Sequence, residues 1–328
     1  MRKLVLGLLI TLLSTSVFAA DKPQKIEHII FISLDGLRPD AIQILGNEQA
    51  PTLNRLIAQG ASTMNARTDP TCTWTMPNHA GMITGLPVEG NAGHGVRFNF
   101  NPLEDIHELN GRYVYSVFNI LHNHGLKSIF FASKKKFQFF YKSYFRTIEE
   151  VYMSDMHNKE TFEAFIKEFQ KSKPGFSFLH IADPDETGHK TAWSVEDGSD
   201  YLLAVKRVDA YLGDIIQMIE LDPQLSATTV VIVTADHGGD GEGHFDITHR
   251  ENYTIPFIVW GAGVPQGRDL YFLNAKSRRN PKDKQMPMDA KWQPIRNSDA
   301  ANLILSLFNL PPIPQSIVNY KQDLNVGF

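Results

Sequence analysis

Three apolar runs of the chain each lead into an aspartate, and two of these aspartates have a histidine close by in sequence. The runs cover residues 29–34, 176–181 and 229–234, and the aspartates are Asp35, Asp185 and Asp236. Short β-branched and aromatic runs of this kind predict buried parallel strands. Because ligands bind beyond the carboxyl ends of such strands, the three carboxylates should meet at one edge of the sheet. That much negative charge in one cleft requires a cation, so the sequence predicts a metalloenzyme.

Histidines near these aspartates could supply nitrogen ligands. His237 directly follows Asp236, and His189 lies four residues after Asp185, a spacing that lets both side chains grip one ion. His244 lies seven residues beyond His237. Three carboxylates and three imidazoles suffice for two divalent ions. Nitrogen and oxygen donors without thiolate favour zinc, with manganese or cobalt as alternatives.

A candidate nucleophile precedes a helical pattern at residues 77–84. Pro77 is typical of the first turn of a helix, which places Thr75 at or just before the N-cap, near unsatisfied N–H groups and the positive end of the helix dipole. This position suits an alkoxide and a phosphoryl oxygen. The alternative is that Thr75 only caps the helix.

Strand-like and helical patterns alternate along the chain without a linker. Strands are predicted at residues 29–34, 128–132, 176–181, 229–234 and 255–260, and helices at residues 52–59, 77–84, 159–170, 201–220 and 299–308. This alternation predicts an α/β fold with a mostly parallel central sheet sandwiched between helices. The polar, lysine-rich residues 268–294 are interpreted as a surface segment and not as a domain boundary. Residues 21–328 are therefore predicted to form a single catalytic domain.

The first 20 residues have the pattern of a signal peptide. Arg2 and Lys3 precede an apolar stretch over residues 4–13, and cleavage is predicted after Ala19 or Ala20. The alternative is an uncleaved anchor, but about 15 apolar-rich residues fall short of the roughly 20 needed to span a membrane. We therefore expect a periplasmic or secreted protein without a stable membrane anchor.

Composition narrows the function classes further. Cys72 is the only cysteine, so no intramolecular disulfide can form. The formal net charge is −4, which argues against nucleic-acid binding. The sequence makes no prediction of the oligomeric state.

Five short motifs occur in an order that resembles the alkaline phosphatase superfamily, in particular its type I phosphodiesterase/nucleotide pyrophosphatase branch. They are Asp35-Gly36, Thr75-Met-Pro-Asn-His79, His94-Gly-Val-Arg-Phe-Asn99, Asp185-Glu-Thr-Gly-His189 and Asp236-His237-Gly238. Together they span about two thirds of the chain. Each motif alone is weak, but five in order are specific. The resemblance implies the superfamily's α/β sandwich, which agrees with the predicted strands.

The resemblance also implies roles for the site residues. One zinc ion would be held by Asp35, Thr75, Asp236 and His237, and the other by Asp185, His189 and a third histidine. His244 is preferred to His249 as this third ligand, and Asp183 is a weaker alternative to Asp185. Thr75 would be the nucleophile, and Asn99 would hold a non-bridging phosphoryl oxygen.

The predicted function is an exported two-metal hydrolase of phosphate esters that acts on a small phosphorylated substrate through a covalent phosphothreonine. Alternatives on the same site are a phosphomonoesterase and a head-group phosphotransferase, although the lack of a membrane anchor argues against the transferase. A zinc-binding protein without catalysis is a further alternative, but Thr75 and Asn99 both occupy the catalytic positions. Sulfate ester hydrolysis is not expected, because Cys72 does not begin a Cys/Ser-x-Pro-x-Arg motif.

Charge balance bears on the substrate. Two zinc ions against three carboxylates and one alkoxide leave the site about neutral, which suits a phosphodiester, whereas a phosphomonoester dianion would require additional cations. The candidates for such cations are Arg67, Arg97, Lys134, Lys136 and Arg250. The aromatic residues within 134–145 could form a wall against the leaving group, or the segment could be a strand with its lysines facing outward.

Overall fold

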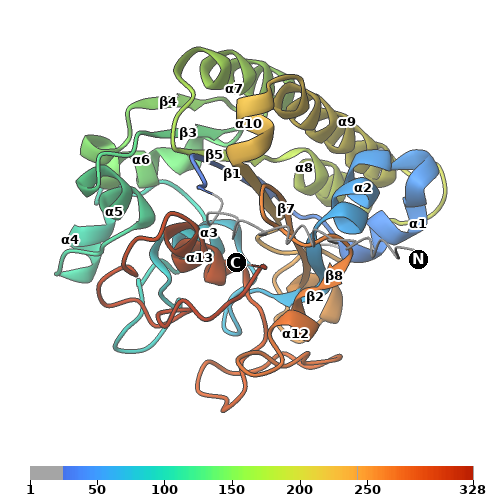
Figure 1. Cartoon of the computed structure of the whole chain (residues 1–328). Coiled ribbons are helices and arrows are strands. Elements are labelled where there is room, and N and C mark those ends of the chain that lie inside the picture. Colours follow the sequence, from blue (N-terminus) through green and yellow to red (C-terminus); the bar gives the residue numbers. More distant parts are fainter. Residues whose placement is uncertain (1–24, 242, 328) are drawn as a thin grey trace, which may run out of the picture.

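A computed structural model describes residues 25–241 and 243–327, so the predicted signal peptide lies outside the described residues. Its centre is an eight-stranded sheet in the order β4-β3-β5-β1-β6-β7-β2-β8 (Figure 1). The strands are β1 (His28–Leu34), β2 (Ala61–Arg67), β3 (Ser128–Ala132), β4 (Glu150–Met153), β5 (Phe176–Ile181), β6 (Thr229–Thr234), β7 (Thr254–Gly261) and β8 (Arg268–Asp269). Of these described strands, only β7 runs antiparallel to its neighbours. The predicted mostly parallel sheet is confirmed.

Helices cover both faces of this sheet. They are α1 (Pro39–Gln49), α2 (Pro51–Gln59), α3 (Thr75–Thr84), α4 (Ile106–Asn110), α5 (Val117–Asn123), α6 (Gln138–Tyr144), α7 (Asn158–Ser172), α8 (Asp183–Thr191), α9 (Asp200–Leu221), α10 (Pro223–Thr228), α11 (Arg250–Tyr253), α12 (Leu270–Leu273) and α13 (Ala300–Leu307). Helices α2, α7 and α9 lie along one side, and α3 and α13 pack together on the other (Figure 1). None of the described helices has both the length and the apolar character needed to cross a membrane.

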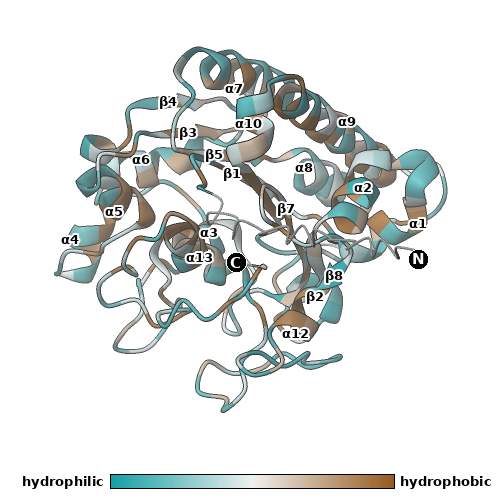
Figure 2. Cartoon of the chain, viewed as in Figure 1, coloured by the Kyte–Doolittle hydropathy of each residue, from teal (hydrophilic) through white to brown (hydrophobic). Residues whose placement is uncertain are grey.

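The central strands are mostly apolar (Figure 2). Every residue of β1, β3, β5 and β6 is buried, because helices cover both faces. Such runs carry a strong strand signal, and the predicted bounds of β3, β5 and β6 agree with the structure. Strands β2 and β4 were not predicted, because their sequences ASTMNAR and EVYM contain fewer apolar residues than those of the central strands.

Strand order brings the predicted site together. Strand β1 pairs in parallel with both β5 and β6, and β3 pairs in parallel with β5. The segments that follow β3, β5, β1 and β6 therefore emerge side by side at the carboxyl edge, where ligands bind in sheets of this kind.

Residues 134–145 differ from the predicted strand. They form a 3₁₀ turn, η1 (Lys135–Phe137), followed by α6. The aromatic side chains of Phe137, Phe140 and Tyr144 recur at helical spacing and are buried in the core. These three aromatic side chains therefore stabilise the fold and do not line a wall against the leaving group.

Candidate active site

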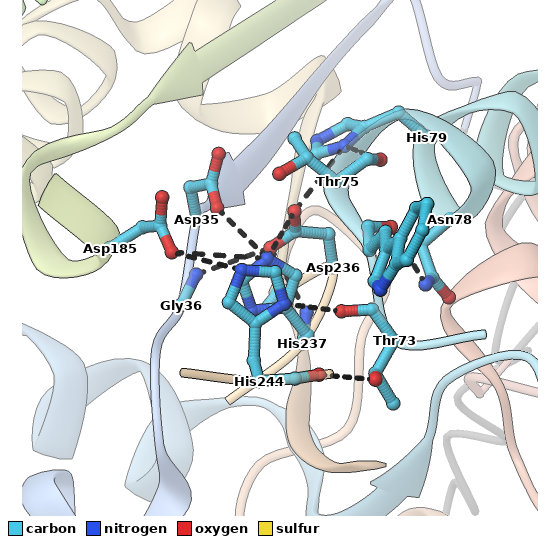
Figure 3. A network of polar contacts seen from close by, with 12 residues as sticks. Asp35, Gly36, Thr73, Thr75, Asn78, His79, Asp185, Asp236, His237 and His244 are labelled. Carbon is cyan, nitrogen blue, oxygen red and sulfur yellow. Dashed lines mark hydrogen bonds and ion pairs between the residues drawn. The ribbon is translucent and has the colours of Figure 1, made fainter. Parts of the chain in front are cut away.

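The three predicted carboxylates converge at the carboxyl edge of the sheet. Asp35 follows β1, Asp185 lies in the first turn of α8 after β5, and Asp236 follows β6; all three are buried. Figure 3 shows their side chains gathered around His237. Gly36 makes this possible, because it adopts φ +68° and a Cβ atom there would lie 2.8 Å from the Cα atom of Asp185.

Two groups of potential metal ligands share His237. The first contains Asp35, Asp236 and His237, and the second contains Asp185, His237 and His244; within each group the ligand atoms lie within 4.8 Å of one another. His237 Nε2 is 3.3 Å from Asp35 Oδ1 and 3.2 Å from Asp236 Oδ2. His244 Nε2 is 3.7 Å from Asp185 Oδ1. Separations of this size are those expected between two ligands of one zinc ion.

The other two candidate ligands, His189 and His249, differ in their distance from these groups. His189 Nε2 is 3.4 Å from Asp185 Oδ1, so it lies beside the second group, although its side chain is 38% exposed. His249 contacts Asp240 and Asp246 at the surface and lies in neither group. The structure therefore brings His244, and not His249, to the predicted metal site.

Backbone carbonyls orient the two buried imidazoles. Nδ1 of His237 is 2.7 Å from the carbonyl oxygen of Gly238, and Nδ1 of His244 is 2.7 Å from that of Thr73. Because a carbonyl oxygen only accepts, each Nδ1 carries a proton, and Nε2 is the ring nitrogen that remains to bind a metal ion.

In each of the three aspartates, one carboxylate oxygen contacts other protein groups and the other oxygen has no hydrogen bond. Oδ2 of Asp35 contacts His180 and Lys134, Oδ2 of Asp185 contacts Lys134, and Oδ1 of Asp236 accepts from the backbone. Among the described residues, Asp35 Oδ1, Asp185 Oδ1, Asp236 Oδ2, His237 Nε2 and Thr75 Oγ1 are all buried without a hydrogen-bond partner. Buried polar atoms in proteins rarely lack a hydrogen-bond partner. These residues fit bound divalent cations.

The electrostatics of the site also call for added positive charge. Although burial opposes it, Lys134 and then His180 hold the pKa of Asp35 well below its usual range. Burial and then the charge of Asp35 raise the pKa of Asp236 to about 7. The protein's own cations therefore do not neutralise all three carboxylates, and a bound divalent ion would.

Thr75 begins helix α3 and does not cap it. The N-cap is Trp74, and no side chain caps the helix. The Thr75 hydroxyl is buried and has no hydrogen-bond partner among the described residues. The interpretation of Thr75 as only a cap is therefore wrong. His79 fixes the start of the helix, since its Nδ1 is 2.8 Å from the Thr75 carbonyl oxygen and its Nε2 is 2.8 Å from Ser33 Oγ in β1.

Asn99 lies next to the start of α3. Its Oδ1 accepts from the backbone N–H of Met76 at 3.3 Å and from Nζ of Lys136 at 2.8 Å. The side-chain amide N–H groups of Asn99 have no hydrogen bond to a described residue, so they can donate to a ligand near Thr75.

From the sequence, one residue of the site was assigned no role and another was not singled out. His180, inside β5, contacts Asp35 and had no assigned role. Lys134 was only one of five candidate cations, yet its Nζ lies 2.6 Å from both Asp35 Oδ2 and Asp185 Oδ2. The available signal was that Lys134 follows a predicted strand in the same way as the three aspartates. Of the other candidates, Arg67 donates to backbone carbonyls, Arg97 pairs with Glu89, and Arg250 pairs with Asp283.

His244→Ala should remove a ligand and lower the affinity for one divalent ion by about 100-fold, whereas His249→Ala should leave it unchanged. The reason is that, of these two histidines, only His244 is buried within a ligand group. Metal content after dialysis against a competing chelator measures the difference. Equal loss from both variants, or loss only from the His249 variant, would contradict this assignment.

Comparisons with known proteins identify the family and the fold of the chain. The family model described as Sulfatase matches residues 27–310. GPI ethanolamine phosphate transferase 1 of Homo sapiens is 24% identical over 261 residues, covering 74% of this chain and 27% of its own length. Venom phosphodiesterase of Naja atra is 26% identical over 316 residues, covering 86% of this chain and 36% of its own length. The chain thus spans about a third or less of these curated relatives.

Among solved structures, murine ectonucleotide pyrophosphatase/phosphodiesterase 5 superposes with a TM-score of 0.61 at 16% identity, over 90% of this chain and 99% of that chain. An inactive threonine-to-alanine variant of the murine protein has been solved in complex with AMP. At this identity the likeness shows the fold. Although the sulfatase nucleophile motif is absent after Cys72, the family match covers most of the described residues, so the chain belongs to the sulfatase family, within the alkaline phosphatase superfamily.

Proposed function

We propose that the protein is a two-metal hydrolase of phosphate esters, of the phosphodiesterase/nucleotide pyrophosphatase type, which acts through a covalent phosphothreonine. The observation that carries this proposal is the Thr75 hydroxyl, which is buried and without a hydrogen bond at the start of α3. The Nδ1 atom of His79 links this residue to the ligand groups, because it lies 2.8 Å from the Thr75 carbonyl oxygen and 3.6 Å from Asp236 Oδ2. The likeness to venom phosphodiesterase supports phosphoester chemistry. The inactive threonine-to-alanine variant of the murine structural neighbour supports a threonine nucleophile.

Two zinc ions, or manganese or cobalt, fit the site. Asp35, Asp236, His237 and Thr75 would hold one ion, and Asp185, His244 and His189 would hold the other, with His237 within reach of both. Bound there, the ions would act as Lewis acids that stabilise the negative charge developing on the reacting oxygens.

The residues then perform an in-line displacement. Thr75 Oγ loses its proton to water and bonds to phosphorus, while the bond from phosphorus to the leaving oxygen breaks and that oxygen takes a proton from water. In the second step a water oxygen bonds to phosphorus, the Thr75 Oγ–phosphorus bond breaks, and Oγ regains a proton. The N-terminus of α3 favours the negative charge. Asn99 donates to a non-bridging oxygen, a contribution worth about 3–4 kcal/mol of transition-state stabilisation.

Substrate assays with the zinc-loaded protein test the proposal. We expect hydrolysis of bis(p-nitrophenyl) phosphate and no hydrolysis of p-nitrophenyl sulfate, because the sulfatase nucleophile motif is absent. Sulfate ester hydrolysis without phosphate ester hydrolysis would overturn the proposal. Zinc binding without turnover of either ester would instead support the non-catalytic alternative.

The likeness to GPI ethanolamine phosphate transferase 1 favours a second candidate function, in which an alcohol replaces water in the second step. Turnover in isotopically labelled water with added ethanolamine or glycerol separates the two. Label in the released phosphate indicates hydrolysis, and an unlabelled new phosphate ester indicates transfer.

We also propose that the protein acts outside the cytoplasm on a small soluble phosphorylated substrate. The support is the basic, then apolar, pattern of residues 2–13 and the small residues at 19 and 20. N-terminal sequencing of protein expressed in a bacterial host should find Ala20 or Asp21 as the first residue. A chain that retains the leader would overturn this proposal.

A further inference from the structure

Three consecutive lysines after β3 have different surroundings. Lys134 is buried and contacts the carboxylates of Asp35 and Asp185. Lys135 points outward, with 62% of its side chain exposed and its Nζ 3.1 Å from Asp155 Oδ2. Lys136 turns back toward the site, where its Nζ lies 2.8 Å from Asn99 Oδ1. The turn η1 therefore presents two of the three ammonium groups to the site.

Lys136 lacks a counter-charge. Among the described residues, no carboxylate oxygen lies within 4.0 Å of its Nζ, and its one hydrogen bond is to a neutral amide oxygen. Burial, and then the charge of Lys134, lower the pKa of Lys136 to about 8. A partly buried ammonium without an anion is unfavourable, so an anionic ligand at this position would be stabilised.

The position of Lys136 relative to the nucleophile is set by two contacts. Oδ1 of Asn99 accepts both from Lys136 Nζ and from the backbone N–H of Met76, the residue after Thr75. The neighbouring Phe137 anchors the turn, with its ring centroid 4.2 Å from that of His180 and 4.7 Å from that of His79. Lys136 and Asn99 thus flank the start of α3, where the phosphoryl group would lie.

The charge balance indicates which phosphoryl group fits. Two divalent ions would balance the three carboxylates and the alkoxide of Thr75, and Lys134 and Lys136 then add positive charge in excess. A phosphodiester brings one negative charge, whereas a phosphomonoester dianion brings two. We propose that Lys136, together with Asn99, binds the non-bridging oxygens of a doubly charged phosphoryl group, so that the protein hydrolyses phosphate monoesters as well as diesters. This inference rests on the proposed function.

The test compares Lys136→Met with Lys135→Met, a matched control one residue away whose ammonium faces solvent. Values of kcat/KM are measured for p-nitrophenyl phosphate and bis(p-nitrophenyl) phosphate, and the affinity for inorganic phosphate is measured by calorimetry. Because a charged hydrogen bond to the second negative charge is lost, Lys136→Met should lower the monoester-to-diester ratio of kcat/KM by roughly 10- to 100-fold. It should weaken phosphate binding by a similar factor. Lys135→Met should change neither, and Lys136→Arg should retain most of both.

Three results would overturn the inference: no monoesterase activity in the wild type, no loss on either ester in Lys136→Met, or equal losses on both esters. Equal losses would mean that Lys136 only positions Asn99. If the wild type hydrolyses neither ester, the proposed function fails. In that case the phosphate affinities of the same variants still test whether Lys136 binds an anion. An unchanged affinity in Lys136→Met would show that it does not.

Discussion

Replacing Thr75 by alanine should lower kcat for phosphate ester hydrolysis by about four orders of magnitude or more, the size of effect seen when an enzyme loses its nucleophile. The physical reason is that the covalent route needs an oxygen at this position. Thr75 Oγ1 is buried, and no described residue makes a hydrogen bond that would occupy it. Initial-rate kinetics with bis(p-nitrophenyl) phosphate measure the effect.

Thr75→Ser is the matched variant, because it keeps the hydroxyl and removes only a methyl group. We expect it to retain activity within about tenfold of the wild type and to yield a covalent phosphoserine in rapid-quench experiments. Metal content must be measured for both variants, since Thr75 is also a potential ligand. An alanine variant that binds metal normally and keeps full activity would exclude the covalent mechanism.

Removing the divalent metal should abolish hydrolysis and lower the melting temperature together. Without the ions, Asp35, Asp185 and Asp236 remain buried near one another with Lys134 as the main cation, and their repulsion opposes folding. A bound ion stabilises the folded state by about 4 kcal/mol when its free concentration is 1,000 times its Kd. Activity and thermal unfolding after chelation, and again after zinc addition, measure both effects.

Zinc, manganese or cobalt should restore activity and melting temperature, and magnesium should not, because the ligand groups contain imidazole nitrogen. The Thr75→Ala variant provides a control in which the melting temperature responds to metal without any turnover. If chelation changes neither the activity nor the melting temperature of the wild type, the ligand groups are not a metal site.

The sequence determined the main lines of the fold and most of the site. Strands β1, β5 and β6 are buried on both faces, so each is a mostly apolar run, and such runs are visible without a structure. Parallel strands place their carboxyl ends at one edge. It followed that Asp35, Asp185 and Asp236 would meet, and the structure confirms that they do.

Some elements could not be predicted from local sequence. Strand β7 has an apolar run like the others, and its antiparallel direction depends on the chain connections and pairing partners. Strands β2 and β4 have weak patterns of their own and are held by pairing with β7 and β3. Residues 138–144 are rich in aromatic residues, which favour strands in isolation, but helical packing against the core decides their conformation.

Within the site, residue types came from the sequence and partners came from the tertiary structure. Spacing left His244 and His249 as competitors; the fold buries the first against Asp185 and leaves the second at the surface. Three adjacent lysines are equivalent in sequence, yet β3 beside β5 places Lys134 between two carboxylates and the turn η1 places Lys136 on Asn99. Contacts of this kind join residues far apart in the chain, and only strand order and packing determine which side chains meet.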